Sequence, residues 1–407
     1  MPATGTTRTT GRYERTSAAG EDVLAFVPLP LPPTEPPLAP NAALAGRLRA
    51  AERALQRFEL AMNILPEVDW LVGALARMDA VASSRLSGVR SALTDHFGVE
   101  AHDDTPAPRA GSSTPVEAAR DLFDAQRLAR RSIAAAPGTP ISVALLCEAH
   151  QRLVPIAKAN PGKLRSDATW VGGSRPSNAI FVPPPPHRLA DLMGELEGYW
   201  QSDDPQHPLI RAGLVLMQFD TIRPFEEGNG RIGRLLVTLL LERWKLLPAP
   251  IVGLSRFFER HRREYHRRQN AVRLDGDWEG WLDFFLDGVA TAADEAVGSA
   301  RSLALLVAND RARVLAHDGV SISALRLLDG LPRHPIVTVA SVMALIGTTK
   351  PTAGKAIELL VAAKVLTEST GKKRDRVFVY ASFLERLDVD SATGSAVNMR
   401  ELRGISN

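Results

Sequence analysis

The chain has 407 residues, of which 45% are hydrophobic and 23% charged, a composition typical of a globular protein with about two or three domains. Its formal net charge of +3 does not by itself predict a nucleic-acid partner. A single cysteine excludes an internal disulfide, and we find neither a signal peptide nor an apolar run that could span a bilayer, so we expect a cytoplasmic protein with no membrane partner.

The first 40 residues are predicted to lie outside the folded core. Residues 1–20 are rich in Thr, Gly, Ser and Arg, and we expect them to be disordered. The clustered prolines from Pro28 to Pro40 exclude a helix, so this segment is predicted to be an extended arm over the folded body. A ligand for a proline-binding partner is the alternative.

Residues 41–110 are predicted to form an N-terminal helical region. Apolar residues recur at three- and four-residue spacing in LAGRLRAAERALQRFELAMNIL and in WLVGALARMDAVASSRL, which indicates amphipathic helices. A polar gap between residues 102 and 120 is typical of a linker. It ends in a helix start with Ser113 or Thr114 as the cap.

Residues 111–300 are predicted to form a helical core with one interruption, from Gly162 to Leu189. This segment holds Gly-Gly, Arg-Pro and four consecutive prolines, so it cannot be a helix. Two short extended pieces, ATWVG and AIFVP, are joined by GSRPSN and predict a β-hairpin. One hairpin cannot form the core of a helical domain, so we expect a surface flap beside a site.

Residues 301–390 are predicted to form a winged helix-turn-helix, followed by a tail over residues 391–407. HPIVTVASVMALIG predicts a helix that stops at glycine, TTKPTAGKAIELLVAAKVL predicts a second helix with Thr349 as cap, and LTESTGKKRDRVFVY predicts a basic hairpin. The alternatives for this module are DNA binding, target docking or assembly of a homodimer. The residues that would meet DNA are Lys350, Lys355, Lys372, Lys373, Arg374 and Arg376.

The segment from Phe219 to Trp244 predicts an anion site. Gly228 and Gly230 allow a tight turn with positive φ, and Asn229 tolerates the same geometry. A strongly apolar helix follows directly. The turn therefore aims several backbone N–H groups, and the positive end of the helix dipole, at one point in space.

Charged residues around this turn fit an oligophosphate. Arg231 and Arg234 lie one helical turn apart, and each guanidinium can donate two parallel hydrogen bonds. Glu227, directly before the turn, supplies a hard oxygen that could hold Mg²⁺ against the phosphates. The pattern therefore predicts nucleotide binding.

At this point the chain resembles the Fic (Fido) family, whose signature is His-Pro-Phe-x-(Asp/Glu)-Gly-Asn-Gly-Arg-x-x-Arg. The matching string here is Arg223-Pro224-Phe225-Glu226-Glu227-Gly228-Asn229-Gly230-Arg231-Ile232-Gly233-Arg234. The flap, the N-terminal helices, the segment FFERHRREYHRRQNAVRLDGDWEGWLDFFLDG and the C-terminal winged helix also resemble the larger bacterial members. The fold class that we expect is therefore mainly α: a Fic-type helical core with a β-hairpin flap and a C-terminal winged helix-turn-helix.

The resemblance implies transfer of AMP from ATP, with Mg²⁺, to a hydroxyl of a target protein. By the same resemblance Glu227 would bind the metal, and Gly228, Asn229 and Gly230 would hold the α- and β-phosphates. Arg231 and Arg234 would steady the distal phosphates, and Tyr265 could reach the base or ribose. The flap would clamp the target backbone through Trp170, Gly172, Gly173, Ala179, Ile180, Phe181 and Val182.

Two residues depart from the family pattern. Arg223 occupies the position of the histidine that serves as general base. A guanidinium stays charged to about pH 12, so the usual base is absent, and such a base contributes about 10²–10⁴ in rate. In the inhibitory segment, which here spans Ser83 to Gly88, Ser87 replaces a glutamate that would pair with Arg234. We therefore expect Arg234 to be free.

Three hypotheses remain open. The protein is a nucleotide-binding pseudoenzyme that signals by occupancy, and in one version it is a transcription regulator that acts through the winged helix. Alternatively it is a transferase with a different base, for which His187 and His261 are the candidates, or with an acceptor that is already ionised. In the third, it is an AMP-transferase that works slowly, because positioning and charge supply most of the rate in phosphoryl-type chemistry.

Overall fold

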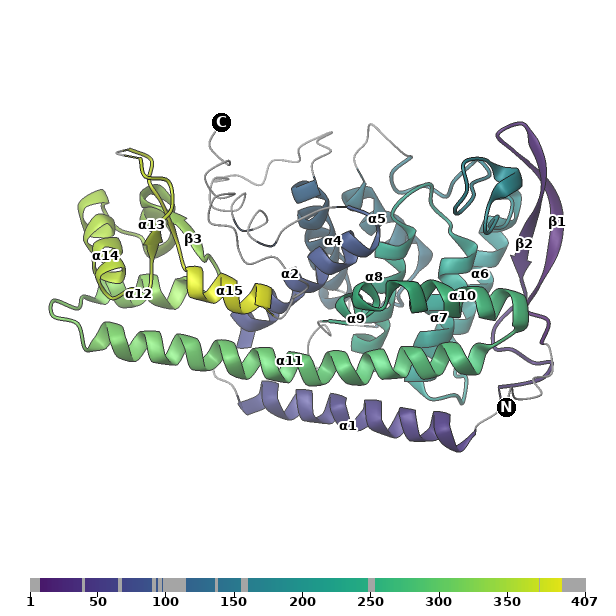
Figure 1. Ribbon diagram of the computed structural model, residues 1–407, viewed down its shortest axis with the longest axis horizontal. Helices are drawn as coiled ribbons and strands as arrows, with labels where there is room; N and C mark the ends of the chain where they lie inside the picture. The colour runs from purple at the N-terminus through teal and green to yellow at the C-terminus, as the bar shows by residue number, and fades with distance from the viewer. Residues whose placement is uncertain are drawn as a thin grey trace.

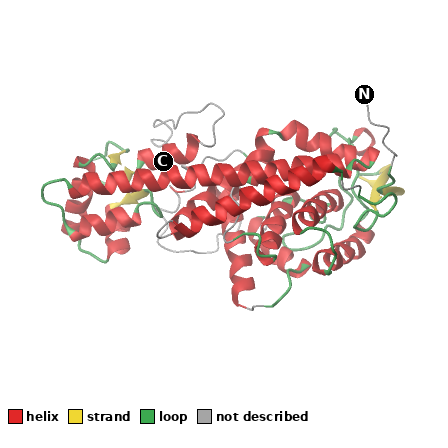
Figure 2. Ribbon diagram, turned by 90° about the horizontal axis from the view of Figure 1, so that it is seen from below, coloured by secondary structure: helices red, strands yellow, loops and turns green. Residues whose placement is uncertain are grey.

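A computed structural model describes residues 8–38, 41–64, 68–89, 93, 97, 115–135, 138–154, 160–247, 253–372 and 374–389. Within these residues the molecule is mainly helical, with small antiparallel sheets at its two ends (Figure 1 and Figure 2). The mainly α fold class predicted from the sequence is confirmed. Among the described helices, none combines the length and apolarity that a membrane crossing needs.

The core is organised around two consecutive helices, α7 (Pro208–Ile222) and α8 (Asn229–Arg243). Every residue of α7 after its first proline is buried, as expected of a helix that is surrounded on all sides. The helices that contact α7 or α8 are α2 (Val68–Leu86), α4 (Pro115–Ala135), α5 (Val143–Leu153), α6 (Leu189–Gln201), α10 (Arg262–Asp275) and α11 (Trp278–Leu315), while α9 (Leu254–Arg260) packs on α2. The loop between α7 and α8 therefore lies at the centre of the domain.

A 38-residue helix, α11 (Trp278–Leu315), runs along the whole molecule, with α1 (Ala42–Ile64) lying against it (Figure 1). Ion pairs from Arg47 and Arg57 of α1 to aspartates of α11 reinforce this contact. The predicted domain boundary between residues 300 and 301 falls inside α11 and is not a structural break. The helix continues because the spacing of its buried residues persists through Ala300 and Leu303.

Helix α4 begins at Pro115, a position that suits proline because the first N–H of a helix needs no partner. The predicted caps Ser113 and Thr114, like the polar linker before them, lie outside the described residues.

The prediction of disorder for residues 1–20 is wrong for residues 11–18. Strands β1 (Gly11–Ala18) and β2 (Glu21–Pro28) pair antiparallel from Gly11↔Pro28 to Ala18↔Glu21. Ala19 and Gly20 connect them with φ of 47° and 82°, as a two-residue hairpin turn requires. The polar composition predicted disorder because most of β1 faces solvent. In β2, by contrast, Ala25, Phe26 and Val27 are buried.

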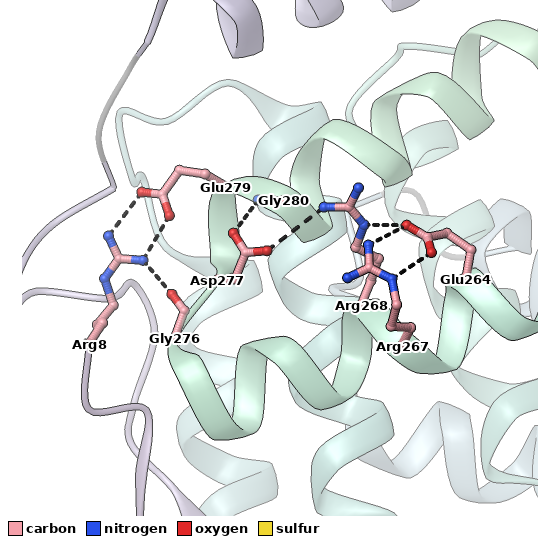
Figure 3. Close-up of polar contacts among 8 residues, drawn as sticks. All are labelled: Arg8, Glu264, Arg267, Arg268, Gly276, Asp277, Glu279 and Gly280. Carbon is pink, nitrogen blue, oxygen red and sulfur yellow. Dashed lines mark hydrogen bonds and ion pairs between the residues drawn. The ribbon is translucent and has the colours of Figure 1, made fainter. Parts of the chain in front are cut away.

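The N-terminal segment is tied to the turn between α10 and α11. Arg8 is 7% exposed and donates to both carboxylate oxygens of Glu279 at 2.9 Å and to the carbonyl of Gly276 at 2.9 Å (Figure 3). The same guanidinium donates to the carbonyls of Pro36 and Pro37. Arg8 thereby connects the proline-rich arm to the helical body.

The C-terminal module combines short helices with a three-stranded sheet in the order β3-β5-β4. Its elements are α12 (Ile322–Gly330), β3 (Ile336–Thr338), α13 (Val339–Ile346), α14 (Lys350–Ala362), β4 (Thr367–Glu368), β5 (Val377–Val379) and α15 (Ala381–Val389).

One detail of this module differs from the sequence prediction. Residues 336–338 form a strand instead of the first turn of a helix, because they pair with residues 377–379 of β5. The helix starts one residue later, where Thr338 and Ser341 form a capping box. Thr349 is the N-cap residue of α14, as predicted from the sequence.

Candidate functional site

The loop between α7 and α8 is closed by one side chain. The Asn229 amide accepts a hydrogen bond from the Phe225 N–H at 2.8 Å and donates one to the Phe225 carbonyl at 2.7 Å. Gly228, the N-cap of α8, has φ 76°, and a Cβ there would lie 3.1 Å from a methyl of Leu153, so only glycine suits this position.

The same loop presents the start of α8 as an anion site. The first hydrogen bond that belongs to the helix is from the Ile232 N–H to the Gly228 carbonyl, at 3.0 Å. The N–H groups of Asn229, Gly230 and Arg231 therefore have no acceptor within the helix, and they point out of its N-terminus.

His150 of α5, which the sequence analysis did not single out, supports the loop from behind. Its Nδ1 accepts from the Gly162 N–H at 2.9 Å, so Nε2 carries the hydrogen and donates to the Glu227 carbonyl at 3.1 Å. The ring stacks on Phe225 with centroids 3.9 Å apart. Burial lowers the pKa of His150 to about 4, so the imidazole is neutral near pH 7. Its sequence context is an apolar helix, which carries no signal of this role.

Arg234 is not free, contrary to the sequence prediction. It is 5% exposed and donates to Ser83 Oγ at 2.9 Å, to the Ser83 carbonyl at 2.8 Å and to Ser87 Oγ at 3.1 Å. Ser83 lies in the last turn of α2 and Ser87 directly after it, with Gly88 in a left-handed conformation. Neutral oxygens of two serines therefore hold this arginine.

A buried carboxylate missed by the sequence analysis lies one turn earlier on α2. Asp79 accepts hydrogen bonds from the Ser255 N–H and hydroxyl, both at 2.9 Å, and from the Gly253 N–H. Burial raises the pKa of Asp79, and the nearby charge of Arg234 opposes that shift. Asp79 thus fixes the start of α9 close to Arg234.

Arg231 and Glu227 differ in exposure. Arg231 is 7% exposed, and its Nε has no hydrogen-bond partner among the described residues. Burial, together with the charge of Arg234, lowers the pKa of Arg231 to about 10. Glu227 is exposed at the loop surface. The described residues hold no group of three metal-ligating side chains, so a cation at Glu227 would need phosphate oxygens as further ligands.

Arg223 ends α7 in a left-handed conformation, with φ 47° and ψ 66°. The helix ends here because Pro224 disfavours helical backbone in the residue before it. The Arg223 carbonyl accepts a hydrogen bond from Arg165 Nε at 2.9 Å. Burial lowers the pKa of the Arg223 guanidinium, while Asp220 favours its charged form.

Tyr265 is buried and lies close to Arg234, and its contact with a nucleotide stays a prediction. Its side chain is 3% exposed and donates to Asp220 Oδ2 at 2.5 Å, beside a 2.7 Å hydrogen bond from Gln269 to the same oxygen. The charged sequence around Tyr265 hid its burial, because only one face of α10 packs against Phe258 and Trp281.

The predicted flap is a turned loop closed by one bridge, not a regular β-hairpin. Val171 donates to the Phe181 carbonyl at 2.8 Å, and Ile180 donates to the Val171 carbonyl at 2.9 Å. The tip holds a short helical turn, η1 (Pro176–Asn178). Strands do not extend because Gly172 and Gly173 both have φ +70° and curl the chain. Trp170 and Ala179 are partly exposed, Ile180 is 70% exposed, and Phe181 and Val182 are buried.

The N-terminal hairpin continues the flap, a contact that the sequence analysis missed. The Phe26 N–H donates to the Val182 carbonyl at 2.9 Å, and the Ser177 N–H donates to Glu21 at 3.0 Å. The Phe26 and Phe181 rings lie edge to face with centroids 6.3 Å apart. Strand β2 therefore fixes the base of the flap.

Comparison with known proteins identifies the segment that carries this loop. Residues 140–241 match the Fic/DOC family. This segment is a Fic/DOC family domain. The Fic domain thus contains α5 to α8, the flap and the loop that ends in Asn229.

Two curated relatives align with part of this chain. A protein adenylyltransferase Fic from Culex quinquefasciatus is 29% identical over 145 residues, which cover 35% of this chain and 26% of that protein. A uridine 5′-monophosphate transferase from Xanthomonas campestris is 28% identical over 196 residues, which cover 43% of this chain and 36% of that protein. The alignments thus span about a quarter to a third of these relatives.

Two crystal structures share the fold. A Fic family protein from Desulfovibrio desulfuricans has a TM-score of 0.54 at 18% identity, and covers 85% of this chain and 98% of its own. A Fic domain containing signaling protein from Bacteroides thetaiotaomicron has a TM-score of 0.50 at 15% identity. The match covers 62% of this chain and 97% of that protein's chain. At these identities the similarity concerns the fold alone.

The two alternative bases have partners elsewhere. His187, beside the flap, contacts Glu14 of β1 at 2.9 Å. The Nδ1 of His261 donates to the Phe257 carbonyl at 2.9 Å, at the junction of α9 and α10. Within the described residues the structure brings neither ring into hydrogen-bond contact with the Fic loop.

The His150 contacts predict an acid-sensitive loop. Because the folded pKa of about 4 lies below the ordinary 6.5, the unfolded chain binds the proton more tightly. The free energy of unfolding is therefore highest above pH 6.5 and decreases by about 3 kcal/mol as the pH falls towards 4. Urea unfolding of wild type and His150→Phe between pH 4 and 7 measures this step. A variant that keeps the wild-type pH slope would contradict it.

Proposed function

We propose that the Fic domain binds a nucleoside triphosphate with its phosphates at the N-terminus of α8. Three features support this: the first N–H groups of that helix, which have no acceptor within it; the buried Arg231, whose Nε has no partner among the described residues; and Arg234 within the same turn. Glu227 would hold Mg²⁺ against the phosphate oxygens. The relatives carry the names of an adenylyl and a uridylyl transferase, so ATP and UTP are both candidates.

The ties of Arg234 to α2 are compatible with this binding. Each hydrogen bond from the charged Arg234 guanidinium to a neutral serine oxygen contributes about 1.5–3 kcal/mol net. A triphosphate oxygen carries a charge of its own, so it bonds the same guanidinium more strongly and can replace one of them. Arg234 is therefore positioned by Ser83 and Ser87 without being blocked by a carboxylate.

Transfer of the nucleotide to a neutral protein hydroxyl is proposed to be weak or lost. The observation that carries this proposal is the cation Arg223 at the position of the general base, with burial around its guanidinium. A target protein would dock on the flap, where Ile180 is exposed. If transfer is absent altogether, the domain acts as a nucleotide sensor, which is the alternative function.

Restoring the base should restore transfer. We expect Arg223→His to raise labelling of protein by α-labelled ATP or UTP with Mg²⁺ at least about 100-fold over wild type. Both proteins should bind the same nucleotide in a calorimetric titration. Strong labelling by the wild type would show a transferase with another base, and an absence of nucleotide binding in both would remove the proposed function.

A carboxylate at position 87 should compete with the nucleotide for Arg234. We expect Ser87→Glu to weaken ATP binding about tenfold, because an ion pair replaces a neutral hydrogen bond. Ser87→Gln has the same shape without the charge and serves as the matched control. Equal affinities of the Glu and Gln variants, measured by calorimetry, would show that Arg234 does not contact the nucleotide.

A second function is proposed for residues 322–389, which we interpret as a winged helix. The helix order, the strand order β3-β5-β4 and the position of α14 support this interpretation. Of the residues predicted to face DNA, Lys373 lies outside the described residues. The others are exposed: Lys350, Lys355, Lys372, Arg374 and Arg376. A regulator would couple nucleotide occupancy to DNA through α11; a docking or dimer module is the alternative.

DNA binding has a clear signature in salt. If this module binds DNA, affinity should fall steeply and linearly in log[salt], and the double change Lys350→Gln/Lys355→Gln should reduce that slope by about 2. Lys163→Gln, before the flap, is the control. Fluorescence anisotropy with duplex DNA makes the measurement, and no binding at low salt would exclude the regulator function.

A further inference from the structure

Three arginines from different parts of the Fic domain and its neighbouring helix gather under the flap. Arg223 ends α7, Arg165 precedes the flap, and Arg273 lies in the last turn of α10. The sequence signature contains only Arg223. Arg165 and Arg273 lie outside the signature and are brought close to Arg223 by the tertiary structure.

Arg165 is held rigidly but without a carboxylate. It is 2% exposed, and its hydrogen bonds go to the carbonyls of Arg223 at 2.9 Å, Asp167 at 2.9 Å and Pro184 at 2.5 Å. The last of these links it to the C-terminal end of the flap. Arg165 thus joins the loop that starts at Arg223 to the flap and leaves its charge uncompensated by these contacts.

Arg223 and Arg273 are brought together by Asp220. Arg223 lies one turn after Asp220 on α7, and Arg273 lies one turn after Gln269 on α10. The hydrogen bond from Gln269 to Asp220 at 2.7 Å joins the two helices at this level. The Arg273 guanidinium covers the Phe181 ring of the flap at 4.2 Å from the centroid and donates to Asn270 at 2.6 Å.

The charges in this cluster do not balance. The groups that face Arg223 and Arg273 are Asp220 and Tyr265, with Tyr13 of β1 and His266 of α10 also near Arg273. Asp220 is the one carboxylate among them, and its Oδ2 already accepts from Tyr265 and Gln269. Burial and the charge of Arg223 lower the pKa of Arg165 and of Arg273 to about 10 each. A partly buried excess of positive charge is costly unless an anion joins it.

Arg223 also has an unused donor. Its Nε is buried and has no hydrogen-bond partner among the described residues. Most buried donors in folded proteins are paired, so an unpaired guanidinium donor beside two further cations indicates a ligand oxygen.

We propose that Arg223 and Arg273, braced by Arg165, form a subsite beneath the flap for an anionic acceptor of the phosphate-monoester class. This inference rests on the proposed nucleotide site, where Arg231 and Arg234 serve the triphosphate at the start of α8. The Arg223–Arg273 pair belongs to the flap side, since Arg273 lies on Phe181. The pair therefore faces the acceptor and not the nucleotide.

The proposed acceptor removes the need for a general base. An oxygen of the phosphate acceptor attacks the α-phosphorus of the nucleoside triphosphate, and the bond from that phosphorus to the bridging oxygen breaks. Pyrophosphate leaves with the bridging oxygen and its electron pair, and the acceptor becomes a phosphoanhydride. No proton has to leave the ionised acceptor oxygen, so the arginine that replaces the base positions the nucleophile instead.

Binding tests the subsite apart from catalysis. Phenyl phosphate is titrated calorimetrically into the full chain, with and without saturating α,β-methylene ATP, which cannot undergo α–β cleavage. We expect phenyl phosphate to bind in both cases. Its affinity should be about tenfold or more weaker in Arg273→Gln and partly recovered in Arg273→Lys. It should be unchanged in Arg263→Gln, which alters an exposed arginine of the same helix. The proposal would be overturned if phenyl phosphate does not bind to a protein that circular dichroism shows to be folded. It would also be overturned if α,β-methylene ATP displaces phenyl phosphate, because the arginines would then belong to the nucleotide site.

Turnover gives the second test. Inorganic phosphate labelled with ³²P, supplied with unlabelled ATP and Mg²⁺, should yield labelled ADP together with unlabelled pyrophosphate. In a second assay, Arg223→His should shift the acceptor preference from phenyl phosphate towards phenol at least tenfold. An unchanged preference would contradict the subsite. Titration of ATP alone keeps the outcomes separate: a failure there removes the nucleotide site, whereas ATP binding without binding of phenyl phosphate removes only the acceptor subsite.

Discussion

The geometry of the site depends on two hydrogen bonds between the Asn229 amide and the backbone of Phe225. They bend the chain back between α7 and α8 and set the direction in which the first N–H groups of α8 point. Gly228 provides the left-handed residue that this bend requires, and His150 supports it from behind through Glu227 and the Phe225 ring. Every charged group of the site is placed relative to this closed loop.

Around the loop, charge is arranged in two separate groups of arginines. Arg231 and Arg234 lie at the start of α8, where neutral serine oxygens of α2 and the more distant Asp79 accompany them. Arg223 and Arg273 lie on the flap side, around Asp220. The two groups are separate because the loop lies between them; we propose that the first serves a nucleotide and the second an acceptor.

The flap depends on a segment far from the Fic domain in sequence. Strand β2 bonds to Val182, and Phe26 packs on Phe181, which also contacts Arg273. Arg8 in turn connects the N-terminal arm to the turn between α10 and α11. The surroundings of Arg273 are therefore assembled from the N-terminal arm, the flap and α10 together.

The sequence by itself determined the mainly helical fold, the glycine-rich turn before α8 and the place of Arg223 directly before that turn. These follow from neighbours in the chain: the glycines, the Asn229–Phe225 pair and the apolar spacing of α8 act within a few residues of one another. Only the tertiary structure decided that Arg234 bonds to Ser83, 151 positions away, that Tyr265 is buried and that residues 11–18 form a strand. Such contacts depend on which helix faces and strand edges meet, and local propensity does not encode that choice.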